Sequence, residues 1–100
     1  MPQESTNVRQ RNDSRTREPH RYLVLIHNDD FTPMDFVVEI LVTIFRKPQP
    51  DAVTLMLSVH HSERAVAGVY SYDIARSKAD KAMRLAREKG YPLRLTCEPE

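Results

Sequence analysis

The segment from His27 to Thr32 concentrates side chains that can do chemistry. His27, Asn28, Asp29 and Asp30 place an imidazole, an amide and two carboxylates in a row, and Thr32 follows closely. Asn and Asp are favoured in turns because their side chains hydrogen-bond to nearby backbone groups. A turn needs one or two such residues, however, and Thr32 is available to begin a helix. The additional oxygen acceptors indicate a site for a cation.

A metal ion is the first candidate. His27, Asp29, Asp30, His60 and His61 could supply oxygen and nitrogen ligands. Their spacing matches neither an EF-hand loop, which needs a longer acidic series with a glycine, nor a zincin motif. We therefore expect no metal and no other cofactor.

Catalysis is the second candidate, with His60 as a general base oriented by Asp29. The chain has no G-x-S-x-G motif and no glycine-rich phosphate loop. Its single cysteine, Cys97, falls on the inward face of a predicted strand. We therefore do not expect an enzyme.

An organic ammonium group is the third candidate. An α-amino group has a pKa near 8, so it is mostly charged at neutral pH. Its three N–H donors suit an amide oxygen, a carboxylate and an imidazole nitrogen, which Asn28, Asp29 and His60 could provide.

Apolar residues lie near both parts of this polar set, that is, near Asn28 and Asp29 and near His60. Met56 and Val59 lie on the same helix face as His60, and Met34 and Val37 lie at the end of a predicted helix nearest Asp29. If the two helices meet, polar groups would line one end of an apolar cleft. The alternative is that these Met and Val residues belong only to the core.

The elements that must position these residues follow from periodicity and end signals. Thr32 is the predicted N-cap of a helix, with Pro33 at its first position and Asp35 in capping-box spacing. Ser71 can cap a later helix, and Gly90 ends it. In chain order we predict a strand at 22–26, a helix from 33 to 45, a helix at 51–60, a strand at 65–70, a helix that carries Ala75, Ala79, Ala82 and Ala86 on one stripe, and an alternating strand at 91–97.

This order, β-α-α-β-α-β, predicts an α+β fold: a small α/β sandwich in which helices cover a three-stranded antiparallel sheet. Residues 1–19 are polar and of mixed charge, and we predict a disordered N-terminal arm before a domain at 20–100. The net charge of +1 gives no argument for nucleic acid or an anionic membrane. The lone cysteine suits a reducing compartment, so we expect a cytoplasmic protein.

Four stretches together resemble the ClpS family, the adaptors of the ATP-dependent Clp protease. They are NDDFTPMDFVVEIL, TLMLSVHHS, VAGVYSYDIARSKA and GYPLRLTCEPE, and the resemblance covers residues 20–100. The family fold is a compact α/β domain with the element order predicted above.

The resemblance implies recognition of N-degrons, that is, substrates with a free N-terminal Leu, Phe, Tyr or Trp. It implies that Asn28, Asp29 and His60 hold the α-amino group, and that Asp30 and Thr32 shape the adjoining turn. It also implies that Met34 is a gate against β-branched residues. The implied side-chain pocket consists of Met34, Val37, Met56, Val59 and Leu93.

The resemblance further implies that substrates are delivered to the N-terminal domain of a Clp AAA+ ATPase. Asp73 and Lys78 match the ATPase-facing positions, and residues 1–19 match the segment that the ATPase engages. Glu63 stands where the family usually has glycine, and Arg76 where an acidic residue is common. We expect a monomer. The alternative class is a general interaction domain of similar fold, such as the one that ends the ribosomal stalk protein.

Overall fold

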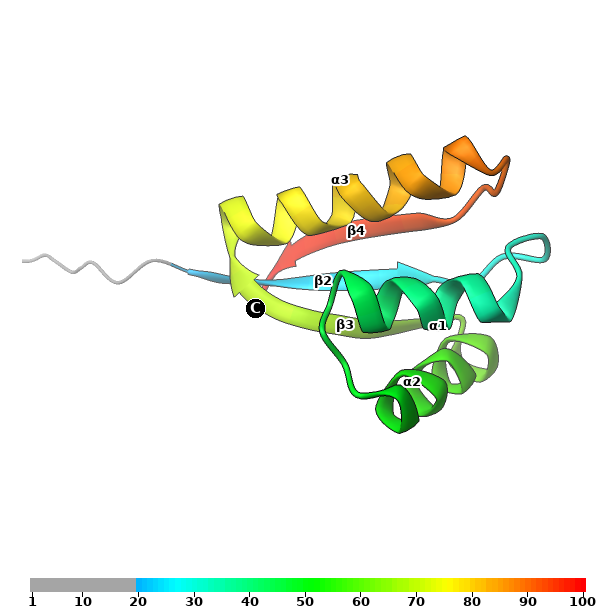
Figure 1. Cartoon of the computed structure of the whole chain (residues 1–100). Helices are drawn as coiled ribbons and strands as arrows, with labels where there is room; N and C mark the ends of the chain where they lie inside the picture. The colour runs from blue at the N-terminus through cyan, green and yellow to red at the C-terminus, as the bar shows by residue number, and fades with distance from the viewer. Residues whose placement is uncertain (1–19) are drawn as a thin grey trace, which may run out of the picture.

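The structure is a computed structural model that describes residues 20–100 (Figure 1). It confirms the predicted fold class and element order, whereas the predicted arm, residues 1–19, lies outside the described residues. The elements in chain order are β2 (Arg21–His27), α1 (Met34–Thr43), α2 (Gln49–Ser62), β3 (Arg64–Ser71), α3 (Tyr72–Glu88) and β4 (Arg94–Pro99).

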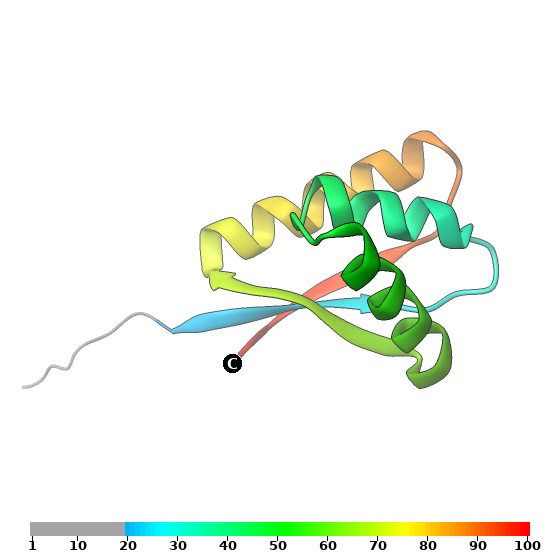
Figure 2. The same ribbon diagram turned by 60° about the horizontal axis from the view of Figure 1, so that its bottom comes forward.

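Strand β2 lies in the centre of the sheet, and it pairs antiparallel with β3 on one side and β4 on the other. Its central residues Val24, Leu25 and Ile26 are all buried, at 0%, 6% and 0% exposed, whereas Leu23 is half-buried. Figure 2 shows the helices gathered on one side of the sheet. The last residue of β2, His27, pairs with both neighbouring strands, which fixes the point where the polar segment leaves the sheet.

Helix α3 packs against the sheet through its predicted alanine stripe. Ala75, Ala79, Ala82 and Ala86 are all 0% exposed. Because alanine has no side-chain atom beyond Cβ, the helix can approach the strands closely. This half of the molecule therefore contains a dense core.

The start of α1 differs from the prediction. Its N-cap is Pro33, without a side-chain cap hydrogen bond, so Thr32 as N-cap is wrong. The carbonyl of Pro33 accepts hydrogen bonds from the N–H groups of Phe36 and Val37, and the hydroxyl of Thr32 is used elsewhere.

Two other boundaries also differ from the prediction. Helix α2 begins at Gln49 rather than at residue 51, since proline is tolerated in the first helical turn. Strand β4 begins at Arg94 rather than at residue 91. Tyr91 instead donates its N–H to the carbonyl of Ala86 and so closes the end of α3.

Candidate functional site: a cavity between the 28–32 loop, α1 and α2

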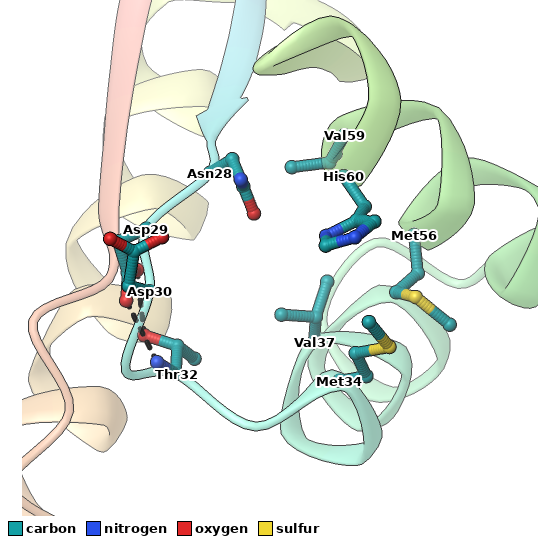
Figure 3. Close-up of a pocket in the computed structure, with 9 residues that line it drawn as sticks. All are labelled: Asn28, Asp29, Asp30, Thr32, Met34, Val37, Met56, Val59 and His60. Carbon is teal, nitrogen blue, oxygen red and sulfur yellow. Dashed lines mark hydrogen bonds between the residues drawn. The ribbon is translucent and has the colours of Figure 1, made fainter.

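A cavity of about 190 Å³ lies where β2 ends, between the following loop, the start of α1 and the C-terminal half of α2 (Figure 3). It is smaller than the roughly 300–1,000 Å³ of pockets for drug-sized ligands, so it suits a single side chain. All its lining residues are among those singled out from the sequence: Asn28, Asp29, Asp30, Thr32, Met34, Val37, Met56, Val59 and His60.

Asp29 organises the loop. One carboxylate oxygen, Oδ1, accepts hydrogen bonds from the backbone N–H groups of Phe31 (2.8 Å) and Thr32 (2.7 Å). The other, Oδ2, accepts the hydroxyl proton of Thr32 at 2.7 Å. Asp29 is therefore not a surplus acceptor, as the sequence had suggested, because it closes the turn that Thr32 completes.

These contacts also set the charge of Asp29. Burial by itself raises the pKa of Asp29, but the hydrogen bonds from Thr32 and Phe31 and the nearby charge of Arg87 bring the pKa below its usual value. A lowered folded pKa stabilises the fold at pH values above the unfolded value of about 3.9. That contribution is lost as the pH falls through the folded pKa. Asp29 is thus a negative charge at neutral pH.

Asn28 faces the cavity from the end of β2. Its backbone N–H donates to the carbonyl of Glu63 at 2.8 Å, which ties the end of β2 to the end of α2. Glu63 adopts a left-handed conformation (φ 70°), so the turn that ends α2 forms without glycine. Because His60 lies in the last turn of α2, this link brings His60 opposite Asn28, and Figure 3 shows both side chains facing the same space.

The apolar end of the cavity comes from both helices. Val37 on α1 and Val59 on α2 are buried, at 7% and 3% exposed. Met34 is 47% exposed and lies beside Met56 at the mouth (Figure 3). Flexible thioethers suit a mouth that must adapt to a ligand.

Leu93 is the one predicted pocket residue that the structure places elsewhere. It is 1% exposed, belongs to the core cluster and is not among the residues that line the cavity. Arg87 donates to its carbonyl at 2.7 Å, which fixes the segment before β4. The sequence showed that Leu93 is buried, but alternation does not separate core from cavity.

The two predicted ATPase-facing residues differ in their surroundings. Asp73 is exposed in the first turn of α3. Lys78 is half-buried: its ammonium group donates to the carbonyl of Ile44 at 2.7 Å and lies 5.3 Å from the centre of the Tyr70 ring. Lys78 therefore also holds the C-terminal end of α1.

The other chemical interpretations find little geometric support. Within residues 20–100, no three His, Cys, Asp or Glu side chains come together as a metal site. The hydrogen bonds of the Asp29 carboxylate all go to residues 31 and 32, so His60 is not oriented by Asp29. Burial raises the pKa of the Cys97 thiol, which favours its unreactive form.

Sequence reasoning missed how two residues support the site. Glu63 was noted only as a replacement for the family's usual glycine, whereas in the structure its carbonyl anchors Asn28. Arg87 contributes positive charge near Asp29, although it lies far along the chain on α3. Only folding brings these groups to the loop.

The fold and the cavity define a small two-layer α/β domain that carries a pocket with a polar end and an apolar end. Among the helices of residues 20–100, none has the length and apolar character needed to span a bilayer.

The family model described as "ATP-dependent Clp protease adaptor protein ClpS" matches residues 17–96. The ATP-dependent Clp protease adapter protein ClpS of Acetivibrio thermocellus is 46% identical over 97 residues, which cover 97% of this chain and 98% of that protein. The ClpS of Desulfotalea psychrophila is 51% identical over 88 residues, 88% of this chain and 86% of the relative.

A solved structure is also similar. Agrobacterium tumefaciens ClpS2 bound to L-phenylalaninamide matches with a TM-score of 0.81 and 40% identity, over 83% of this chain and 100% of that chain. The chain therefore belongs to the ClpS family of Clp protease adaptors.

Proposed function

We propose that this protein binds substrates through a free N-terminal Leu, Phe, Tyr or Trp and delivers them to a Clp ATPase for degradation. The cavity carries the proposal, because it joins hydrogen-bonding groups to an apolar pocket sized for one side chain. Membership of the ClpS family supports the adaptor role. L-Phenylalaninamide, the ligand of A. tumefaciens ClpS2, combines a free α-amino group with an apolar side chain and supports the ligand class.

In this proposal Asn28, Asp29 and His60 hold the α-amino group. The amide oxygen of Asn28 and an imidazole nitrogen of His60 accept its N–H bonds across the cavity (Figure 3). Asp29 supplies negative charge and keeps the loop in shape through its bonds to Thr32. Asp30, which is exposed at the cavity edge, adds a second negative charge.

The first side chain of the substrate enters between Val37, Met56 and Val59, with Met34 as the gate. A thioether beside the mouth leaves depth for Leu or Phe but little width near the β-carbon. Met34→Ala should therefore admit peptides that begin with Ile or Val, as measured by fluorescence anisotropy. Unchanged selectivity would remove Met34 as the gate.

Neither the polar end nor the apolar end of the cavity should be sufficient for stable binding on its own. A hydrogen bond to a charged group contributes about 1.5–3 kcal/mol, and burial of a Leu or Phe side chain about as much. Association costs on the order of 4–15 kcal/mol. Stable binding therefore requires both a free amine and a bulky apolar side chain.

A peptide pair tests the proposal. One labelled peptide begins with a free Phe, and its twin is identical except for N-acetylation, which removes the charge and two donors. We expect the free peptide to bind and the acetylated one to bind at least tenfold more weakly. Equal binding, or indifference to the first residue, would overturn the proposal and favour an interaction domain of another kind.

Delivery requires a second surface. For this surface we propose Asp73 and Lys78 on α3 as contacts to the N-terminal domain of the ATPase. We also propose that the ATPase engages residues 1–19. Asp73 gives the cleaner test, because it is exposed while Lys78 is bonded to Ile44. Asp73→Lys should weaken binding to the ATPase domain and leave peptide binding intact. Deletion of residues 1–19 should impair degradation of the substrate but not its binding.

A further inference from the structure

The methionines at the mouth of the cavity differ in their surroundings from the methionine on α3. Met34 is 47% exposed, and both Met34 and Met56 line the cavity (Figure 3). Met83 on α3 is half-buried, packs against the core and does not line the cavity. Among residues 20–100, the methionine side chain that is most open to solvent therefore lies at the mouth of the cavity.

A solvent-exposed thioether can be oxidised by a peroxide. A lone pair of the sulfur attacks one oxygen of hydrogen peroxide, and the O–O bond breaks. The sulfur keeps that oxygen as a sulfoxide, while the other oxygen takes up its proton and leaves as water. The sulfur loses two electrons and the peroxide gains them. A methionine sulfoxide reductase removes the oxygen again, so the change is reversible.

A sulfoxide at the mouth of the cavity is unfavourable once a substrate is bound. The apolar end of the cavity consists of Val37, Met56 and Val59, whose side chains have no N–H or O–H group. The oxygen of an oxidised Met34 is hydrated as long as the mouth is open. When the first side chain of a substrate covers the mouth, the oxygen loses that water and finds no donor at the apolar end, so its burial is costly.

We propose that Met34 is a site of reversible oxidation by peroxide, and that its sulfoxide form weakens the capture of an apolar N-terminal residue. The inference rests on the function proposed above and adds a control of that function. Exposure selects the site, because Met56 and Met83 are both half-buried. Position gives the effect, because Met34 lies where the substrate side chain enters.

Peptide mapping by mass spectrometry tests the site. The full chain is treated with hydrogen peroxide, and catalase stops the reaction. Dithiothreitol then reverses any oxidation of Cys97 to a sulfenic acid or a disulfide but leaves a methionine sulfoxide in place. The gain of one oxygen should appear at Met34 before it appears at Met56 or Met83. Oxidation of Met83 ahead of Met34 would contradict the assignment.

Peptide binding tests the effect. A labelled peptide that begins with a free Phe and contains no Met or Cys is titrated against untreated protein and against protein oxidised at Met34. Oxidation should weaken binding about tenfold, because the buried sulfoxide oxygen has no partner. Incubation with a methionine sulfoxide reductase should restore the affinity of the untreated protein.

Two variants assign the effect to one sulfur. Met34→Leu changes a residue of the pocket, so its affinity before treatment serves as its own reference. The ratio of its affinities before and after peroxide should stay near one, because leucine has no sulfur. Met83→Leu is the matched control, since Met83 lies outside the cavity. This variant should lose about as much affinity on oxidation as the unchanged protein.

The outcomes are distinguishable. If the untreated protein does not bind the Phe peptide, the proposed function itself fails. If it binds, but the form oxidised at Met34 binds equally well, oxidation of Met34 does not control capture. The same conclusion follows if Met34→Leu loses as much affinity on treatment as the unchanged protein.

Discussion

The two ends of the helical layer cover the sheet in different ways. Helix α3 meets the strands with four alanines that are all 0% exposed, so the helix can lie close to the sheet. Helix α2 has two buried residues, Ala52 and Val59, and leaves apolar side chains such as Leu57 exposed at 44%. The α3 half is therefore dense, whereas the α1–α2 half combines the buried core residues of α1 with a cavity between the two helices.

The largest predicted effect is a loss of stability caused by a substitution in the α3 half. Ala82→Leu adds a bulky side chain at a fully buried position, and overpacking of a core costs about 1–3 kcal/mol. Urea denaturation should show that loss in the free energy of unfolding. Lys81→Leu, at the exposed neighbouring position, should change it little. Equal stability of the two variants would show that the α3 stripe is not closely packed.

On the open half, the largest effect should come from Asp29. Asp29→Ala removes the acceptor of three hydrogen bonds in the loop and a negative charge near the proposed amine. Binding of a Phe-initiated peptide should weaken at least tenfold, about 1.4 kcal/mol. Asp51→Ala is the control, because Asp51 is an exposed acid on α2 that does not line the cavity. Equal losses in the two variants would mean that Asp29 does not organise the site.

Lys78 tests whether the two halves are independent. Lys78→Met keeps the length of the side chain but removes its bond to the carbonyl of Ile44. The free energy of unfolding should fall by about 1 kcal/mol, while peptide binding stays the same, because the cavity lies at the other end of α1. A clear loss of peptide affinity would show that the C-terminal end of α1 controls the pocket.

The smallest change in stability should come from a substitution of Glu63. Its left-handed conformation costs an L-residue about 1–2 kcal/mol, whereas glycine has no such penalty but loses more backbone entropy on folding. Glu63→Gly should therefore raise the free energy of unfolding by about 0.5–1 kcal/mol. The anchor to Asn28 uses the backbone carbonyl, so peptide binding should not change. Destabilisation would contradict the account of this turn.

The same contrast explains how much the sequence could predict. The α3 stripe was predictable because four alanines at helical spacing are typical of a helix face that packs closely against a sheet. Thr32 was misassigned because a cap and a turn use the same residue types, and only the folded loop shows that its hydroxyl bonds to Asp29. Leu93 was placed in the pocket by the family resemblance alone; in the structure it is buried and does not line the cavity.

The pocket itself was predictable as a set of residues but not as an arrangement. The sequence placed His60 on the same helix face as Met56, and Asn28 at the end of a strand. That these two groups face each other depends on the bond between Asn28 and Glu63, which joins residues far apart in the chain. No local pattern encodes that contact.

The central claim is that the α1–α2 half recognises a free amine together with an apolar side chain. The most direct test is NMR titration with L-phenylalaninamide and with its N-acetylated form. We predict that the free amine shifts the side-chain amide of Asn28 and the methyl groups of Met34 and Met56, while the methyl groups of Ala79 and Ala82 stay in place. The acetylated form should cause none of these shifts at the same concentration. Equal shifts with both ligands, or shifts centred on α3, would contradict the claim.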